Sequence, residues 1–229
     1  KKDYSLVYLE KQLTHFRGQK NIFDNFKKIS SSEKNSVLAM NESFEYFFTN
    51  HRFFKSSKYK KTLASINRFK IKYKSNSINH NDFNFKNEVY NFFLTNKSDR
   101  INQTGTWNYL KYSKYKDFIH LNLTNHKCLC TAIYIDNKII AATIGFIDNE
   151  IFYYIFPSYD SKWGKISPGL INLYLSFKDF FENKLCNKFD FTIGNEPYKD
   201  VWSNESSFLF QSFFVSSIKG FFLVPFLNY

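Results

Sequence analysis

The sequence has few of the residues that build disulfide-stapled or collagen-like proteins. Its 229 residues include 3 cysteines, 7 glycines and 4 prolines. The small, odd number of cysteines argues against a secreted disulfide scaffold and favours a reducing cytoplasm. The scarcity of glycine and proline excludes a collagen-like chain. A hydrophobic content of 43% excludes intrinsic disorder, because it supplies enough apolar surface for a core.

A long hydrophobic run and an N-terminal leader are also missing from the sequence. The most apolar stretch, residues 208–227, is interrupted by Gln211, Lys219 and Pro225, whereas a membrane span needs about 20 predominantly apolar residues. We therefore expect core strands and a tail there. The chain opens with Lys1 rather than Met and has no basic stretch followed by an apolar one. We expect a fragment of a longer protein.

Acidic residues are outnumbered, with 20 Asp and Glu against 32 Lys and Arg and a net charge of +12. Residues 55–74 contain eight basic residues and no acid. Apolar side chains recur there at spacings of three and four, which predicts one amphipathic helix with a basic outer surface: Tyr59, Leu63, Ile66, Phe69 and Tyr73. Such a surface attracts anions, and four interpretations stay open: a solvated face, a phosphate-bearing donor, an anionic acceptor or a membrane.

Hydrophobic periodicity and turn residues divide the remaining chain into helices and strands. Helices are predicted at residues 41–50, with Asn41 or Ser43 as the cap, and at 82–94, 107–121, 170–183 and 198–202. Strands are predicted at 4–9, 128–135, 139–147, 151–156, 189–193, 208–215 and 220–226. The turn residues Asp136-Asn137 and Asp148-Asn149 join the three strands between 128 and 156, which predicts an antiparallel meander.

The predicted elements follow the order found in the core of the GNAT acyltransferases: an antiparallel meander, a loop that leads into a helix, another strand and a short helix. Two sets of residues resemble one branch of that superfamily, the BioF-like or CelD-like acetyltransferases, which are related to the FemABX peptidyltransferases. They are Ser167-Pro168-Gly169, and Asp190 with Gly194-Asn195-Glu196-Pro197-Tyr198-Lys199 and Trp202. The resemblance implies an α+β GNAT fold, with a central, mostly antiparallel sheet flanked by helices.

The resemblance extends from about residue 55 to residue 202. It implies that residues 51–229 are the acyltransferase domain, and that residues 1–50 are the remnant of a preceding GNAT-like half with a connecting helix.

Acyl-CoA, as acetyl-CoA or another acyl-CoA, is the co-substrate that the resemblance implies. A helix N-terminus after a glycine-bearing loop offers free N–H groups to a pyrophosphate. The expected contacts are Gly164, Lys165, Ser167, Gly169 and Asn195, with charge from Lys162 as well. The pantetheine arm would pair like a strand between residues 151–156 and 189–193. The common GNAT phosphate signature, Arg or Gln before Gly-x-Gly or Gly-x-Ala, is absent, so aminoacyl-tRNA, the donor of the FemABX relatives, stays an alternative.

Three residues are the candidates for the chemical step. Tyr198 stands where GNAT enzymes often place the acid that protonates the leaving thiolate, and its alternative is a packing role. Lys199 would orient the acyl carbonyl or an anionic acceptor, against the alternative of a surface lysine. Asp190 lies within an apolar strand, where an unpaired carboxylate would be costly. It is therefore either a base or a structural partner.

The acceptor site is predicted from aromatic and acidic residues of the kind that line sugar sites: Tyr159, Asp160, Trp107, Glu196 and Trp202. No metal is expected, because His126, Cys128 and Cys130 have no second ligand pair. Nucleotide phosphate loops and hydrolase elbows are absent as motifs.

The sequence and the resemblance together predict a bacterial, cytoplasmic acyltransferase. It would move an acyl group from acyl-CoA to an amine or hydroxyl of a sugar or envelope-polysaccharide precursor, either a small molecule or lipid-linked. Peripheral contact with an anionic inner membrane and a homo-oligomer are left open. The alternatives are a FemABX-like aminoacyl-tRNA-dependent transferase and a catalytically silent GNAT-like binding module.

Overall fold

The computed structural model describes residues 6–16, 19–40, 43–105, 108–217 and 219. The chain divides into two compact units, Lys1–Val37 with Ile193–Tyr229, and Leu38–Thr192. We call them the smaller and the larger unit. The predicted division at residue 50, between a preceding half and a catalytic domain, stays a prediction.

The smaller unit is built on three antiparallel strands. β10 (Glu205–Val215) lies between β1 (Leu6–Gln12) and β4 (Lys27–Ala39), whose last residues belong to the larger unit. A short ribbon of β2 (His15–Phe16) and β3 (Gln19–Lys20), the 3-10 helix η1 (Ile22–Asn25) and the helix α6 (Pro197–Trp202) complete it. The predicted strand at 220–226 lies outside the described residues.

The larger unit contains a five-stranded sheet in the order β9-β8-β7-β6-β5. These strands are β5 (Lys72–Ser75), β6 (Cys128–Ile135), β7 (Lys138–Asp148), β8 (Ile151–Tyr159) and β9 (Lys188–Ile193). β5 to β8 pair antiparallel, and β9 alone pairs parallel, with β8. The predicted mostly antiparallel sheet is confirmed.

Two-residue turns hold the meander together. Asp136 and Asn137 have φ values of 47° and 60°, and Asn149 and Glu150 have 49° and 61°. Positive φ at both central positions is the type I′ geometry that matches the twist of paired strands. The second turn therefore begins one residue later than predicted, since Asp148 still pairs with Ile151 in the ladder.

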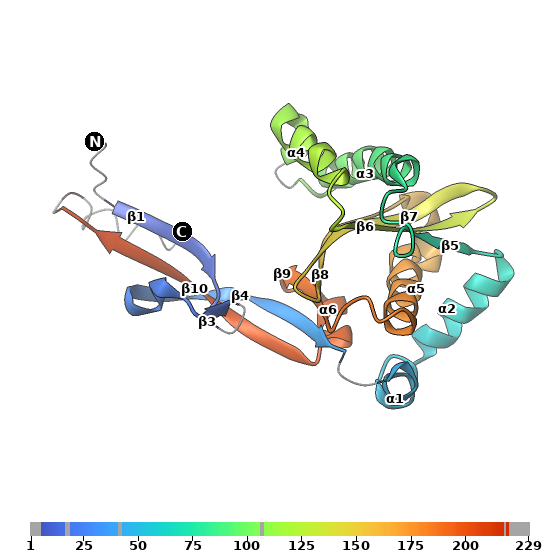
Figure 1. Cartoon of the computed structure of the whole chain (residues 1–229), viewed down its shortest axis with the longest axis horizontal. Helices are drawn as coiled ribbons and strands as arrows, with labels where there is room; N and C mark the ends of the chain where they lie inside the picture. The colour runs from blue at the N-terminus through green and yellow to red at the C-terminus, as the bar shows by residue number, and fades with distance from the viewer. Residues whose placement is uncertain (1–5, 17–18, 41–42, 106–107, 218, 220–229) are drawn as a thin grey trace. The chain divides into compact units, whose positions relative to one another are not determined.

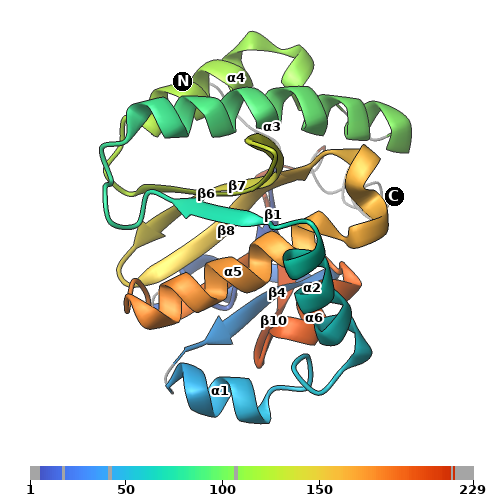
Figure 2. The ribbon, with the colours of Figure 1, turned by 90° about the vertical axis from the view of Figure 1, so that its right-hand side faces the viewer.

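Helices cover both faces of this sheet (Figures 1 and 2). One face carries α3 (Phe83–Thr104), the 3-10 helix η2 (Tyr109–Lys111) and α4 (Ser113–Leu123). The other carries α5 (Pro168–Glu182), with α2 (Ser57–Arg68) and α1 (Phe44–Asn50) beside it. None of the helices in the described ranges is both long enough and apolar enough to span a membrane.

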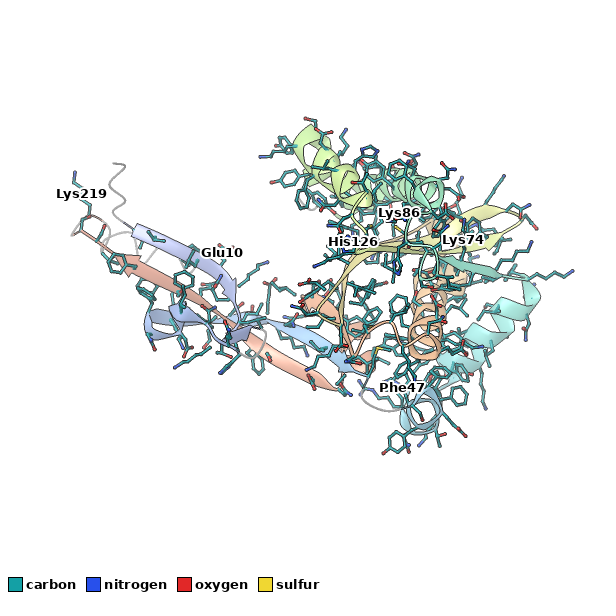
Figure 3. All side chains as sticks on the ribbon, viewed as in Figure 1. Glu10, Phe47, Lys74, Lys86, His126 and Lys219 are labelled. Carbon is teal, nitrogen blue, oxygen red and sulfur yellow. The ribbon has the colours of Figure 1, made fainter. Side chains whose placement is uncertain are left out.

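Buried side chains tie these layers together. Phe47 of α1, labelled in Figure 3, stacks on Phe181 with ring centroids 4.9 Å apart. Lys86 of α3, also labelled there, is 2% exposed, and its Nζ donates to the carbonyl oxygens of Leu123 at 3.0 Å and Asn125 at 3.2 Å. These bonds offset the cost of burying the ammonium group and fix the end of α4 against α3.

The single helix predicted at 55–74 is wrong in its second half. α2 ends at Arg68, Lys70 has a left-handed φ of 49°, and β5 then begins at Lys72. Tyr73 lies on this strand, whose backbone pairs with β6. Its fit to the helical spacing is therefore a coincidence. Pairing with a neighbouring strand outweighs a local helical pattern.

Three other boundaries differ from the sequence-based prediction. The helix predicted at 82–94 runs on to Thr104 and ends at Gly105, whose φ of 69° forms a left-handed cap. The helix predicted at 107–121 is η2 followed by α4, and Trp107 lies outside the described residues. β8 continues to Tyr159, and the 3-10 helix η3 (Ser161–Ile166) occupies the predicted loop.

Candidate active site

The central feature of the larger unit is the point where β8 and β9 part. Their parallel ladder has three pairs, of which the last joins Tyr153 to Asp190. Within the described residues the ladder ends there, although β8 continues to Tyr159 along β7. Beyond Tyr153, the described part of β8 therefore has no ladder partner on β9, and the backbone N–H and C=O groups on that edge need another hydrogen-bonding partner.

A β-bulge in β8 lies directly at this point. On β7, Gly145 pairs with Tyr154 and Ile144 with Phe156, so Ile155 is the extra residue. A bulge bends its strand and increases the local twist. Here it turns β8 away from β9 immediately after the last shared pair.

A backbone kink in β9 has the same effect from the other side. Thr192 has a φ of 62°, an unusual conformation for a β-branched residue. The Thr192 backbone N–H donates to Oδ1 of Asp190 at 2.7 Å. Asp190, a predicted catalytic residue, is half-buried and supports this kink.

Aromatic rings fill the interior next to the parting point. Tyr154 packs on Phe189, with centroids 5.4 Å apart, and Phe152 packs on Phe189 at 4.9 Å. Burial raises the pKa of the Tyr154 hydroxyl to about 12, because desolvation disfavours the phenolate. Tyr154 therefore stays protonated at neutral pH and is a poor proton donor.

The predicted phosphate loop lies beyond the other end of β8. It consists of η3 and the start of α5, where Ser167 has a left-handed φ of 55° and Pro168 opens the helix. The side chains of Lys165 and Ser167 are exposed. An added Cβ would meet nothing within 4 Å at Gly164 and only an ordinary contact with Tyr159 at Gly169. Crowding therefore does not require glycine at either position.

A cleft of about 690 Å³ opens beside this loop, between the second half of α3, the β6–β7 turn and the end of β8. Tyr159 and Asp160, both predicted to bind substrate, line it. The Arg100 guanidinium lies 4.8 Å from the centre of the Tyr159 ring. Asp160 also caps η3, since its Oδ1 accepts from the Lys162 N–H at 2.9 Å. The lining carries basic, acidic and aromatic groups, among them Arg100, Lys138, Lys162, Asp99, Asp136 and Trp163.

The smaller unit holds the other predicted residues in one segment, from Gly194 to Trp202. Lys199 is 2% exposed, and its Nζ lies 2.8 Å from the Ile193 carbonyl oxygen and 2.9 Å from Glu196 Oε2. Gly194 has a φ of 135°, and a Cβ there would press on Glu196 and lie 3.0 Å from Lys199 Nζ. This turn requires glycine, and Lys199 supports the turn from within.

The remaining residues of this segment differ in exposure. Tyr198 is half-buried, and Asn195 is exposed, with its Nδ2 donating to the Ser32 carbonyl oxygen at 2.8 Å. Trp202 is fully buried, so a substrate would reach its ring only after a rearrangement. The roles predicted for these residues stay predictions.

Sequence reasoning missed the residues that shape the parting point. Ile155 and Thr192 carry no sequence signal, because a bulge and a left-handed threonine depend on the strands around them. Gly145 did carry one, since a glycine inside an apolar strand often marks a bulge or a close backbone approach. Across the described part of the chain, no group of three His, Cys, Asp or Glu side chains could hold a metal ion.

Comparison with known proteins identifies the fold. Residues 88–200 match a family model described as an acetyltransferase (GNAT) domain. A conserved protein of unknown function from Bacteroides thetaiotaomicron is 14% identical with a TM-score of 0.51, over 82% of this chain and 61% of that one. No curated protein matches the sequence.

Two further solved structures are similar to the chain. The C-terminal domain of a putative lysylphosphatidylglycerol synthetase from Agrobacterium fabrum is 8% identical with a TM-score of 0.55, over 89% of this chain and 66% of that one. FemX is also 8% identical with a TM-score of 0.55, over 90% of this chain and 67% of that one. The chain spans 61% and 66% of the first two structures.

The chain therefore has the GNAT fold, and the predicted fold class is confirmed. The segment that matches the acetyltransferase (GNAT) family model, residues 88–200, contains the parting of β8 and β9, the predicted phosphate loop and the cleft. The narrower placement in the BioF-like or CelD-like branch stays a prediction.

Proposed function

We propose that the chain transfers an acyl group from acyl-CoA, in the simplest case acetyl-CoA, to an amine or hydroxyl of a sugar or envelope-polysaccharide precursor. The observation that carries this proposal is the parting of β8 and β9, with the bulge at Ile155 on one strand and the kink at Thr192 on the other. Together they leave strand-like hydrogen-bonding groups beside an aromatic interior.

The dimensions of β8 fit an extended donor. Tyr154 to Tyr159 comprises six residues, whose five steps cover about 16 Å at the usual rise of a strand. The amide groups of a pantetheine arm would pair with the open edge along this length. The pyrophosphate would then lie at η3 and the first turn of α5, near Lys162 and Lys165, where the helix dipole favours an anion.

The reaction itself needs a proton acceptor and a proton donor. The acceptor nitrogen or oxygen attacks the thioester carbonyl, its proton passes to a base, the carbon–sulfur bond breaks, and the leaving thiolate takes a proton from an acid. We assign the acid to Tyr198 and a base or positioning role to Asp190. Burial of Lys199 favours a positioning role through the Gly194–Glu196 turn.

The cleft beside Tyr159 is our candidate for the acceptor. Tyr159 and Trp163 offer aromatic surface, and Asp99, Asp136 and Asp160 offer carboxylates that accept hydroxyl hydrogen bonds. Because the cleft begins about 16 Å from the parting point, only an extended acceptor would reach both places. A sugar attached to a carrier, such as a lipid-linked precursor, meets this requirement.

A cytoplasmic location belongs to the same proposal. It is supported by three buried cysteines that are all free thiols, Cys128, Cys130 and Cys186, because a reducing compartment keeps such thiols unpaired.

An aminoacyl donor is the second candidate. Its support is the similarity in fold to FemX and to the lysylphosphatidylglycerol synthetase domain, and the absence of the common GNAT phosphate signature. The two candidates share the site and differ in the donor.

Donor binding and turnover distinguish the candidates. We expect acetyl-CoA at about 100 times its Kd to stabilise the protein by about 2.7 kcal/mol, which raises the Tm by about 5 to 10 °C for a chain of this size. Pantetheine, which lacks the phosphates, serves as the matched control and should give a smaller shift. Release of CoA would be measured with candidate acceptors.

Each other outcome has a defined meaning. A shift with aminoacyl-tRNA and none with millimolar CoA would replace the first candidate with the second. Binding of CoA without transfer to any amine or hydroxyl tested would favour the catalytically silent module. No response to either donor would contradict the proposal.

A further inference from the structure

One strongly charged surface of the larger unit takes no part in the site described above. It comprises the exposed side of α2 with the loop before it, and the exposed side of α1. We call it the basic–aromatic surface, and its residues are Lys55, Lys58, Lys60, Lys61, Arg68, Tyr46 and Phe48.

The charge on this surface follows from how α2 packs. At 100° per residue, one side of the helix carries Tyr59, Thr62, Leu63 and Ile66, which are buried or half-buried. Lys61 and Arg68 lie on the opposite side, and Lys58 and Lys60 lie on the two flanks between. The neutral residues there are small, Ser57, Ala64, Ser65 and Asn67, so a flat partner could approach the backbone closely.

Acids are few around these basic side chains. α2 has none, and in the described part of the chain no ion pair involves its lysines. The helices packed beside α2 carry three acids. Glu45 of α1 is exposed, and Asp179 of α5 accepts hydrogen bonds from the hydroxyl groups of Tyr73 and Ser75. Oε1 of Glu182, also on α5, lies 3.8 Å from Nζ of Lys178. The surface therefore keeps a strong positive potential.

Aromatic rings lie next to the lysines. Tyr46 is 55% exposed and Phe48 is 37% exposed. The Phe48 ring packs against Phe54 at 4.6 Å and against Tyr59 at 5.6 Å between centroids. The cluster beneath α1 therefore holds the Phe48 ring in place, and Phe47, labelled in Figure 3, belongs to the buried side of the same helix.

We propose that the basic–aromatic surface docks on an anionic phospholipid bilayer. Lysines near such a surface contribute about 1 kcal/mol each without a fixed geometry, and aromatic rings partition into the headgroup region. Nucleic acid fits less well. Nucleic-acid recognition uses the fixed, bidentate geometry of the guanidinium group, whereas lysine predominates here. Base stacking also needs a free ring face, and Phe48 is engaged by Phe54 and Tyr59.

The proposal does not depend on the donor or the acceptor. Membrane docking would stand if the chain used aminoacyl-tRNA, and acyl transfer would stand if the chain bound no lipid. Docking would, however, bring the enzyme to any lipid-linked acceptor.

Vesicle sedimentation tests the proposal with the whole chain. Vesicles of phosphatidylcholine with 30% phosphatidylglycerol, a composition chosen at roughly the charge of an anionic leaflet, are compared with vesicles of pure phosphatidylcholine. We expect sedimentation only with the anionic vesicles, and loss of binding at high salt. Removing the charge of three lysines in the variant K58Q/K60Q/K61Q should weaken partitioning on the order of 100-fold, given about 1 kcal/mol per lysine.

The matched control is a second triple variant that loses the same three positive charges from helices on the opposite face of the sheet. In K111Q/K114Q/K116Q the substitutions lie on η2 and α4, and binding should change by less than about threefold. Tyr46→Ser should weaken binding several-fold with little change in Tm, because its ring is mostly exposed. Circular dichroism and thermal melting confirm that each variant is folded.

Three results would overturn the proposal. The first is equal sedimentation of the two triple variants, and the second is equal binding to neutral and anionic vesicles. The third is that tRNA displaces the protein from the vesicles and that K58Q/K60Q/K61Q abolishes tRNA binding, because the surface would then be a nucleic-acid site.

Discussion

Gly145→Ala is the substitution that most directly tests the geometry of β8. An added Cβ would collide with the ring of Phe152 and lie 2.6 Å from the Tyr153 carbonyl oxygen. Neither group can move aside easily. Phe152 is 1% exposed and packs against Phe180, with centroids 4.8 Å apart. Tyr153 lies in the ladders with both β7 and β9, opposite Phe146 and Asp190.

The expected loss of stability follows from overpacking. Inserting one methyl group into a filled core costs about 1 to 3 kcal/mol, and the upper end applies here because one of the contacts is with backbone. For a chain of this size, about 3 kcal/mol corresponds to a fall in Tm of roughly 6 to 12 °C. Thermal unfolding followed by circular dichroism measures the change.

Gly164→Ala is the matched control for this experiment. Its new Cβ would meet nothing within 4 Å, so the same chemical change is expected to leave the Tm unchanged or raise it slightly, since alanine restricts the unfolded chain more than glycine does. If Gly145→Ala melts at the same temperature as the Gly164→Ala control, the close approach of β7 and β8 at the bulge is wrong.

Three further predictions concern single side chains. Asp190→Asn keeps the oxygen that accepts from Thr192 but loses the charge, so folding and CoA binding should stay near normal while transfer falls; unchanged steady-state rates would remove the charge from the mechanism. Tyr198→Phe should lower kcat by roughly 100-fold with nearly unchanged CoA affinity if Tyr198 is the acid, whereas normal turnover with an earlier melt would identify a packing role. Asp82 caps α3 by accepting from the Phe85 N–H at 3.0 Å and pairs with Lys74 at 3.0 Å. These contacts lower the pKa of its carboxyl group, the first of them most. Its contribution to stability is therefore present at neutral pH and is lost as the pH falls below about 4, through the lowered pKa. Asp82→Ala should cost about 1 kcal/mol at pH 7 and should reduce the dependence of Tm on pH in the acid range; an unchanged acid profile would contradict this cause.

The meander could be predicted from the sequence because its signals are local. Asp136-Asn137 is a turn pair between two apolar runs, and β6 begins and ends at the predicted residues, Cys128 and Ile135. Pro168 likewise opens α5 as expected, since a proline in the first turn loses no hydrogen bond. Ser43, one of the two predicted caps, accepts from the Tyr46 N–H at the start of α1.

Features that depend on distant partners could not be predicted. β5 lies in a sequence that continues the helical spacing of α2, and only its pairing with β6 makes it a strand. The bulge at Ile155 depends on the register between β7 and β8, and the kink at Thr192 depends on where β9 leaves β8. Arg100 and Lys138 both line the cleft although they are far apart in the sequence.

The candidate site was predicted only in part, because some of its features have local sequence signals and others depend on packing. Motif residues drew attention to Asp190, to the loop before α5 and to the segment after Gly194. The burial of Lys199 and Trp202 became visible only in the folded chain, because each follows from packing around α6 rather than from its neighbours in the sequence.

Hydrogen–deuterium exchange with saturating acetyl-CoA tests the central claim, that the donor binds along β8 where β9 parts from it. Peptides covering residues 154–159 and 161–170 should exchange more slowly with acetyl-CoA bound, because the donor would pair with the open edge of β8 and cover the first turn of α5. Peptides from α1 and α2 should not change. Unchanged exchange at 154–159, with acetyl-CoA shown to be bound by an independent titration, would contradict the account.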